Sequence, residues 1–238
     1  MCTNRTDEVQ PLETLQCGER SIRFRFTPAA NVNRPILLVF HGQAHNAAPA
    51  RFRSEGWNVV CPLDNFGYEG MGSWFLGEQG DFFWLEAIPR ILETVRRQAG
   101  SGRLFTWGSS MGGYAALLHG TLNQADSIYA NLPQTRLLGS QYAYNGSSKY
   151  FEPLFAAIVN ERYNDLRNLI TVRSRTKYFL CFNQLEGSKY FLEQGLPFIE
   201  HLTKLRIKTY AEVRPLSAHG QNHSILEALA LFAKYKDA

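Results

Sequence analysis

The stretch of sequence that most constrains the fold runs from Arg103 to Leu118 and reads R-L-F-T-W-G-S-S-M-G-G-Y-A-A-L-L. Its first part, residues 104–107, is a run of strand-forming residues, and an Ala- and Leu-rich part at helical spacing follows directly after Gly112. The pattern predicts a strand, a sharp turn and a helix, with Ser110 at the apex of the turn.

Small residues flank this apex, and the turn needs them. Gly108 and Gly112 allow the strand and helix backbones to approach closely, so that Ser110 can adopt a strained conformation with its hydroxyl at the start of the helix. The free N–H groups and the dipole of the helix favour an oxyanion there. Ser110 is then either a nucleophile or part of a Gly-Ser turn that is only structural. The position between a strand and a helix favours a nucleophilic Ser110.

Length and composition fit one α/β domain spanning residues 1–238. The chain is 45% apolar and 19% charged, which is typical of a folded protein with a sizeable core. Its 25 basic and 21 acidic residues are scattered and leave a formal charge of only +4. This distribution does not favour a nucleic-acid partner.

The four cysteines, Cys2, Cys17, Cys61 and Cys181, are widely spaced and form no C-x-x-C pair. Cys61 and Cys181 fall in apolar, strand-like runs, where we expect them to be buried as small hydrophobic residues. The N-terminus has no apolar signal core, and no stretch approaches about 18 apolar residues. We therefore expect a reduced, cytoplasmic protein with no membrane span.

Strand and helix patterns alternate along most of the chain. Residues 12–17 and 21–27 alternate apolar and polar side chains around Gly18-Glu19, which predicts an antiparallel hairpin. Further strands are predicted at 36–40, 58–62, 104–107, 127–130, 177–182 and 207–213, and helices at 82–98, after Ser110, at 189–205 and at 224–235. This order predicts an α/β fold with a mostly parallel, doubly wound sheet.

Residues 135–175 are more polar and rich in aromatic side chains, with helical pieces near 150–159 and 164–169. The segment is too short for a second domain. We expect a small helical cap over the site.

The apolar run at 36–40 leads directly into His41-Gly42-Gln43. In a fold of this kind, the residue after such a glycine supplies a backbone N–H to the oxyanion hole. We assign this role to Gln43, together with the N–H of Met111. For the His41 side chain, a structural hydrogen-bonding role is favoured over proton transfer.

A long Gly-rich and aromatic loop, residues 64–81, follows the strand at 58–62. Loops of this length are often functional, and the aromatic residues argue against disorder. Trp74 and Tyr68 form either a substrate-binding wall, for sugar stacking or an acyl group, or a layer packed over the sheet edge. Both interpretations stay open.

A serine hydroxyl becomes a good nucleophile only beside a general base, which in turn needs an acid to orient it. Glu186 follows the strand that ends at Phe182 by four residues, as a triad carboxylate does. Two histidines, His219 and His223, flank G-Q-N after the last strand. We favour His219 because the dipole of the last helix would lower the basicity of His223. The other histidine would then cap that helix or contact substrate.

The remaining motifs exclude several function classes. His45, His119 and His201 lack a comparable position and are expected to be structural or exposed. The sequence contains no H-E-x-x-H, P-loop or G-x-G-x-x-G motif. We therefore expect no metal site and no bound cofactor.

With these pieces, F-H-G-Q, G-S-S-M-G-G and the late histidine loop, the chain resembles the α/β-hydrolase fold superfamily over nearly its whole length. Four segments, G-S-S-M-G-G-Y-A-A-L, N-L-P-Q-T, E-G-S-K-Y and H-G-Q-N, resemble α/β-hydrolase-fold proteins of bacterial capsule and surface-glycan biosynthesis. That group includes O-acetyltransferases and the hydrolase-like component of bacterial accessory secretion systems. Glu186 stands where Asp is commoner.

The resemblance implies acyl transfer from acetyl-CoA to a sugar hydroxyl through an acyl-serine. From the residues, we expect an enzyme with Ser110 as nucleophile, His219 as base and Glu186 as orienting acid. Its substrate is a carbohydrate or a small ester: a sugar hydroxyl as acceptor makes an O-acetyltransferase, and water makes an esterase. The alternative is a non-catalytic hydrolase-fold module that binds a glycan or a partner.

Overall fold

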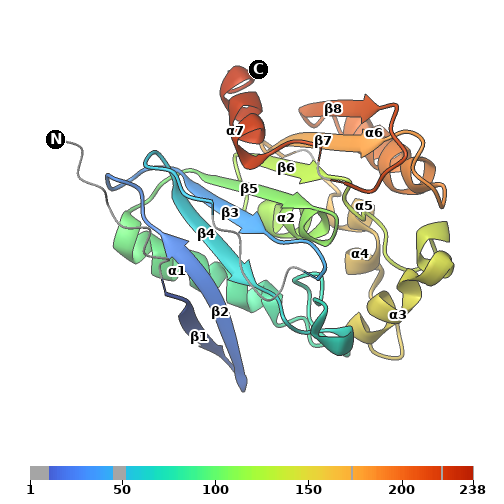
Figure 1. The fold of residues 1–238 in the computed structure, drawn as a ribbon, viewed down its shortest axis with the longest axis horizontal. Coiled ribbons are helices and arrows are strands. Elements are labelled where there is room, and N and C mark those ends of the chain that lie inside the picture. Colours follow the sequence, from blue (N-terminus) through green and yellow to red (C-terminus); the bar gives the residue numbers. More distant parts are fainter. Residues whose placement is uncertain (1–10, 45–51, 173, 221, 238) are drawn as a thin grey trace.

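The computed structural model describes residues 11–44, 52–172, 174–220 and 222–237. Eight strands of this part of the chain form one sheet in the order β1-β2-β4-β3-β5-β6-β7-β8 (Figure 1). The strands are β1 (Glu13–Cys17), β2 (Arg20–Thr27), β3 (Ile36–Phe40), β4 (Asn58–Leu63), β5 (Leu104–Ser109), β6 (Ser127–Asn131), β7 (Lys177–Asn183) and β8 (Thr209–Arg214).

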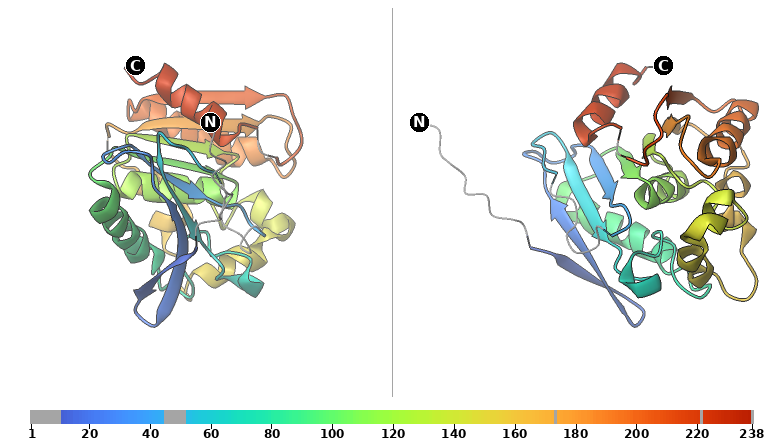
Figure 2. Two further views of the ribbon diagram at one scale, coloured as in Figure 1. Left: turned by 60° about the vertical axis from the view of Figure 1, so that its left-hand side comes forward. Right: turned by 45° about the vertical axis from the view of Figure 1, so that its right-hand side comes forward.

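The sheet is antiparallel at one end and parallel elsewhere. Strand β2 pairs antiparallel with both β1 and β4, and each later neighbouring pair, from β4-β3 to β7-β8, is parallel. The predicted N-terminal hairpin is thus confirmed, and Gly18 closes it with a φ of 57°. The hairpin projects from the body of the molecule in both views of Figure 2.

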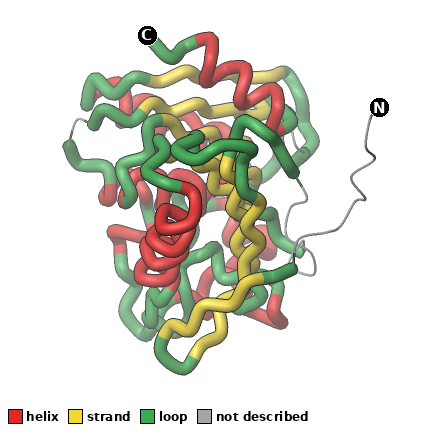
Figure 3. Tube along the Cα trace, turned by 90° about the vertical axis from the view of Figure 1, so that its left-hand side faces the viewer, coloured by secondary structure: helices red, strands yellow, loops and turns green. Residues whose placement is uncertain are grey.

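The central strands are apolar because the sheet is covered on both faces. Every residue of β3 and β4 is buried, whereas the edge strand β8 alternates between exposed and half-buried positions. The twist of the sheet turns its two ends nearly across one another (Figure 3). The predicted mostly parallel, doubly wound architecture is therefore correct.

Helices α1, α2 and α6 pack on one face of the sheet, and α7 packs on the other. On the α7 face, the ring of Phe232 lies 5.3 Å from that of Phe105 and 5.1 Å from that of Phe179. No helix of the described residues is long and apolar enough to cross a membrane. The bounds of these helices are α1 (Trp84–Ala99), α2 (Met111–Leu122), α6 (Leu196–Lys204) and α7 (Ile225–Lys234).

Three short helices, α3 (Ser148–Phe151), α4 (Glu161–Asn164) and α5 (Leu166–Leu169), lie beyond the carboxyl ends of the parallel strands (Figure 1). The helix predicted near 150–159 is shorter than expected. It ends at Leu154, because Phe155 turns to extended backbone (φ −102°, ψ 156°) and is itself buried, with its ring 6.1 Å from that of Phe82.

Candidate active site

The predicted strand, turn and helix are present, with Ser110 between β5 and α2. Ser110 has φ 56° and ψ −119°, a backbone conformation that side chains rarely adopt. A Cβ atom on Gly108 would lie 1.9 Å from the carbonyl oxygen of Gly112, and one on Gly112 would lie 2.3 Å from that of Phe40. The glycines are therefore required by close backbone contacts, as the sequence indicated.

Three side chains from three loops meet at the end of this turn. The Oγ of Ser110 lies 2.8 Å from Nε2 of His219, and Nδ1 of His219 lies 2.5 Å from Oε1 of Glu186. His219 follows β8 and Glu186 follows β7, so the carboxyl edge of the parallel strands brings all three together. The imidazole is 32% exposed, whereas the Glu186 side chain is only 6% exposed.

The chemistry of these groups fixes the direction of each hydrogen bond. An ionised Glu186 only accepts, so Nδ1 of His219 carries the proton and Nε2 accepts the hydroxyl proton of Ser110. The other carboxylate oxygen of Glu186, Oε2, is buried and has no hydrogen-bond partner among the described residues. The contact with His219 is therefore the main polar interaction of this carboxylate.

Amide side chains at the strand ends hold the loop that carries His219. Asn183 Nδ2 donates to the carbonyl of Ala218 at 2.6 Å, and Asn131 Nδ2 donates to the carbonyl of Gly220 at 3.1 Å. The backbone N–H of Asn222 donates to Oδ1 of Asn131 at 3.2 Å. These contacts anchor the loop on both sides of the imidazole.

His223, the other candidate base, belongs to a separate hydrogen-bond network. Its Nδ1 lies 2.5 Å from the hydroxyl of Tyr129, and the guanidinium of Arg214 lies 2.8 Å from its Nε2. The expectation that the second histidine caps the last helix is wrong, whereas its alternative role, contact with substrate, stays a prediction. Ser224 is the N-cap of α7, and it forms a reciprocal capping box with Glu227.

Cys181, Glu212 and His223 offer atoms that all lie within 4.8 Å of one another, a spacing that suits a metal ion. However, Arg214 donates to Oε1 of Glu212 at 2.6 Å and also lies against His223. Burial raises the pKa of the Cys181 thiol, which disfavours the thiolate that a metal needs. A permanent cation thus already contacts two of the three groups, and the cluster fits an ion-pair network better than a metal centre.

The two backbone groups assigned to the oxyanion hole follow neighbouring strands. Phe40 of β3 pairs in register with Gly108 of β5, and Gln43 and Met111 each lie three residues further along. Met111 is the first residue of α2, where backbone N–H groups have no acceptor within the helix. Both residues therefore lie past the same edge of the sheet as Ser110, and their role stays a prediction.

The His41 side chain has the hydrogen-bonding role expected of it. The backbone N–H of Asp64 donates to Nε2 of His41 at 2.9 Å, so the proton of the neutral ring is on Nδ1, which lies 2.8 Å from the carbonyl oxygen of Gly42. That carbonyl belongs to the same planar peptide as the N–H of Gln43. His41 therefore orients the group that we assign to the oxyanion hole.

The buried carboxylate of Asp64 organises the loop at 64–81. It accepts from the N–H and the hydroxyl of Ser73, at 2.7 and 2.9 Å, and from the N–H of Phe75 at 2.7 Å. Burial raises the pKa of this carboxyl, and the donors around it act in the opposite direction. The long loop is thus held from within and packs as an ordered layer.

Trp74 and Tyr68 occupy different environments in this loop. Trp74 is only 2% exposed, and its ring centroid lies 4.9 Å from that of Phe151, which agrees with the packing interpretation. Tyr68 is partly exposed, with its ring edge-on to Tyr150 and the ammonium of Lys149 5.6 Å from its centroid. Of the two residues, only Tyr68 is partly exposed to solvent.

Gln134 is a further residue at this site that the sequence analysis did not single out. Its side chain is buried, and its Nε2 lies 3.1 Å from Oγ of Ser110 and 3.0 Å from the hydroxyl of Tyr190. The Tyr190 ring also packs edge-on against the imidazole of His219, at a centroid distance of 5.3 Å. The signal in the sequence is a polar residue directly after a buried strand, in N-L-P-Q-T.

His119 and His201 have structural roles, and Cys61 and Cys181 are buried, as the sequence analysis predicted. Nε2 of His119 contacts the carbonyl oxygen of Phe75 at 2.7 Å, and burial lowers its pKa to about 4. His201 makes a similar structural contact. Cys61 is buried, and burial raises its pKa to about 12; Cys181 is buried as well. His45 and Cys2 lie outside the described residues.

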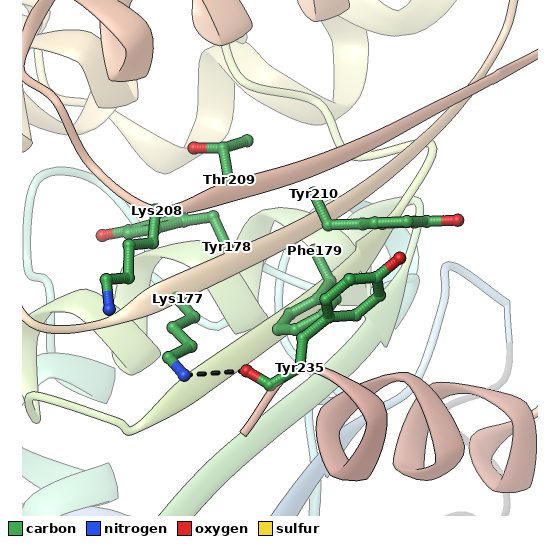
Figure 4. Close-up of a pocket in the computed structure, with 7 residues that line it drawn as sticks. All are labelled: Lys177, Tyr178, Phe179, Lys208, Thr209, Tyr210 and Tyr235. Atoms are coloured by element: carbon green, nitrogen blue, oxygen red, sulfur yellow. Dashed lines mark hydrogen bonds between the residues drawn. The ribbon is translucent and has the colours of Figure 1, made fainter. Parts of the chain in front are cut away.

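A cavity of about 250 Å³ lies at the other end of β7 and β8, near the end of α7 (Figure 4). There the ammonium of Lys177 donates to the carbonyl of Tyr235 at 2.8 Å. Lys177 begins β7, whereas Glu186 follows the end of that strand. The cavity is therefore at the opposite edge of the sheet from Ser110. It is lined by Lys177, Tyr178, Phe179, Lys208, Thr209, Tyr210 and Tyr235.

This chain is similar to known proteins in its structure. No protein-family model matches the sequence, and no curated protein matches it. Among solved structures, an S-formylglutathione hydrolase from Agrobacterium tumefaciens superposes with a TM-score of 0.65 and 16% identity, covering 94% of this chain and 91% of that one. The capsule O-acetyltransferase of Neisseria meningitidis serogroup A superposes with a TM-score of 0.65 and 16% identity, and the match covers 98% of both chains.

An acylaminoacyl peptidase from Pyrococcus horikoshii superposes with a TM-score of 0.68 and 16% identity. The match covers 94% of this chain but only 40% of the peptidase, so the likeness is to one part of that larger protein. These matches extend over nearly all of this chain. On this basis the chain has the α/β-hydrolase fold.

Proposed function

We propose that this protein is a serine-dependent acyltransferase or esterase that works through an acyl-Ser110 intermediate. The observation that carries the proposal is the line of contacts from Ser110 Oγ to His219 and on to Glu186, at 2.8 and 2.5 Å. A serine, a histidine and a carboxylate in this order form an activated nucleophile, because the histidine accepts the hydroxyl proton and the carboxylate orients the ring.

In the first half-reaction, Ser110 Oγ attacks the carbonyl carbon of the donor while its proton moves to Nε2 of His219. The negative charge that forms on the carbonyl oxygen is bound by the N–H groups of Gln43 and Met111. The tetrahedral intermediate then collapses to an acyl-serine. The leaving alcohol or thiol takes the proton from His219, so the ring returns to its neutral form.

In the second half-reaction, an acceptor hydroxyl gives its proton to His219 and attacks the acyl carbon, and Ser110 leaves with that proton. With a sugar hydroxyl as acceptor and acetyl-CoA as donor, the protein is an O-acetyltransferase of surface or capsular carbohydrate. With water as acceptor it is an esterase. The resemblance of the four sequence segments favours the transferase. The similar structures include both a capsule O-acetyltransferase and a lipase/esterase.

A binding surface for the carbohydrate is proposed at Tyr68. Its ring is partly exposed, and sugars commonly stack on such rings, while Lys149 beside it supplies a positive charge for an acidic glycan. Acetyl-CoA acts in this proposal as a co-substrate: its acetyl group passes to Ser110, and CoA leaves as the thiol with the proton from His219.

Two measurements test the proposal. A fluorophosphonate probe should label Ser110 in the folded protein, and Ser110→Ala should abolish the labelling. Absence of labelling would support the non-catalytic binding module instead. Incubation with labelled acetyl-CoA and candidate glycans should move the label to carbohydrate. Hydrolysis of aryl esters without any transfer would reject the transferase and leave the esterase.

A further inference from the structure

Gln134 contacts the reacting oxygen itself, from a position directly beyond β6. The residue is 1% exposed, and its carboxamide lies among three polar groups: the indole of Trp74, the hydroxyl of Tyr190 and the hydroxyl of Ser110. We propose that Gln134 is a catalytic residue whose Nε2–H donates to Ser110 Oγ, directs the hydroxyl proton towards His219 and stabilises the charge that develops on Oγ. The inference rests on the proposed function.

The orientation of the Gln134 carboxamide follows from the chemistry of its neighbours. Trp74 Nε1 lies 3.1 Å from Oε1 of Gln134, and an indole nitrogen can only donate. The oxygen of the carboxamide must therefore face Trp74. Its nitrogen, with two hydrogens, must face Ser110 and Tyr190.

Tyr190 uses one of these two hydrogens. Its hydroxyl donates to the carbonyl oxygen of Leu132 at 2.7 Å, so the phenol oxygen is left to accept from Gln134. Burial raises the pKa of Tyr190 well above its ordinary value, which keeps it a hydroxyl. The second N–H of Gln134 is then directed at Ser110 Oγ.

A donor at Oγ has two effects on the reaction. Because Oγ accepts from Gln134, its own proton is directed to the remaining partner, Nε2 of His219 at 2.8 Å. As that proton moves to His219 and the bond from Oγ to the acyl carbon forms, the donor stabilises the negative charge on Oγ. The same contact stabilises Oγ again when it leaves the acyl carbon in the second half-reaction.

This role differs from that of the oxyanion hole. Gln43 and Met111 are assigned to the carbonyl oxygen of the substrate, whereas Gln134 acts on the oxygen of the enzyme. In the acyl-enzyme, Oγ is an ester oxygen and a weaker acceptor. The contact with Gln134 therefore strengthens towards each transition state, and this selective strengthening is what accelerates a reaction.

The test is stopped-flow acylation of the purified protein by 4-nitrophenyl acetate, with the Gln134→Met and Gln134→Glu variants. Methionine keeps the length of the side chain and removes the donor, so the acylation rate constant should fall on the order of 10²-fold. Glutamate keeps the shape and replaces the donor by an acceptor that competes with His219 for the hydroxyl proton. Its rate constant should be lower still.

A matched control separates this role from packing. Thr106 of β5 is also fully buried and makes one side-chain hydrogen bond, to the carbonyl of Ala116 at 3.0 Å. Thr106→Val should lower the thermal midpoint and leave the acylation rate constant unchanged. Trp74→Phe, which frees the Gln134 carboxamide to turn over, should slow acylation less than Gln134→Met does.

Two outcomes would overturn the inference. One is a Gln134→Met variant that is folded, by circular dichroism, and acylates within twofold of the wild-type rate. The other is a Gln134→Glu variant that acylates within twofold of the wild-type rate, since glutamate keeps the shape of the side chain but has no N–H to donate. Failure of the proposed function gives a different result, because the wild-type protein itself would then not be acylated or labelled.

Discussion

Ser110 and His219 stand 109 positions apart in the chain, and their Oγ and Nε2 atoms lie 2.8 Å apart in the fold. Four neighbouring strands, β5 to β8, produce this contact, since they run parallel and their carboxyl ends lie at one edge. The contact therefore depends on three pairings between neighbouring strands, β5 with β6, β6 with β7 and β7 with β8. We expect labelling of Ser110 by a fluorophosphonate to disappear in the same transition as the near-ultraviolet circular dichroism on unfolding.

Substitution of Ser110 separates reactivity from backbone strain. Both Ser110→Ala and Ser110→Gly should lose labelling and ester hydrolysis. At φ 56° a Cβ atom is unfavourable, so Ser110→Gly should be more stable than Ser110→Ala by about 1 kcal/mol. Urea unfolding of the two variants measures the difference, and equal stabilities would show that the turn is unstrained.

Glu186 should act on rate with little effect on substrate binding. In Glu186→Gln the group facing Nδ1 of His219 is neutral, so the imidazolium that forms during the reaction loses its counter-charge, and kcat should fall by about 10²- to 10⁴-fold. KM should change little. Glu19→Gln, an equal change of charge at an exposed position of the hairpin turn, serves as the control. A kcat for Glu186→Gln within threefold of the control would contradict the role.

His119 should make the stability depend on pH. Burial lowers its pKa from 6.5 to about 4 in the fold, so the unfolded chain binds the proton more readily between these values. The free energy of unfolding is therefore highest above pH 6.5, where the ring is neutral in both states. It falls as the pH drops towards 4, by about 3 kcal/mol in total.

The His119→Gln variant should reduce this dependence, since glutamine can still donate to the carbonyl oxygen of Phe75 but does not titrate. The measurement is the free energy of unfolding in urea at a series of pH values from about 7 to about 4. His201→Gln is the comparison, because His201 is only partly buried. The same slope in the wild type and in His119→Gln would assign the pH dependence to other groups.

Gly108 should tolerate no side chain. A methyl group there would lie 1.9 Å from the carbonyl oxygen of Gly112, so Gly108→Ala must push β5 and α2 apart and should cost roughly 3 kcal/mol of stability. Gly187 has nothing within 4 Å of such a methyl group. Gly187→Ala should therefore leave the thermal midpoint nearly unchanged, and a similar loss in both variants would contradict the close contact.

Local sequence was sufficient for the parts of the site that depend on neighbouring residues. The turn at Ser110 was predictable because its glycines and its helix lie within a few positions. Glu186 and His219 were identified by their place after strands, and the structure brings both to Ser110. The choice between His219 and His223 depended on the dipole of α7, and His223 indeed lies in another network, with Tyr129 and Arg214.

What the sequence could not predict depends on contacts between distant segments. Gln134 contacts Ser110 and Tyr190, and Asn131 holds the loop of His219. Both residues lie in the N-L-P-Q-T segment, but amide side chains after a strand are common and the segment itself does not indicate these contacts. The early end of the helix at Leu154 has a similar cause. Phe155 leaves the helix to pack on Phe82, which is distant in sequence.

The anchors of the His219 loop are groups that keep one charge over the whole working range of pH. Asn183 and Asn131 are neutral amides, and Arg214, which donates to the carbonyl of Asn222 at 3.0 Å, is always a cation. Acidification therefore leaves these anchors unchanged. Asn183 and Asn131 should therefore hold the loop that carries the base in place while the reacting groups ionise.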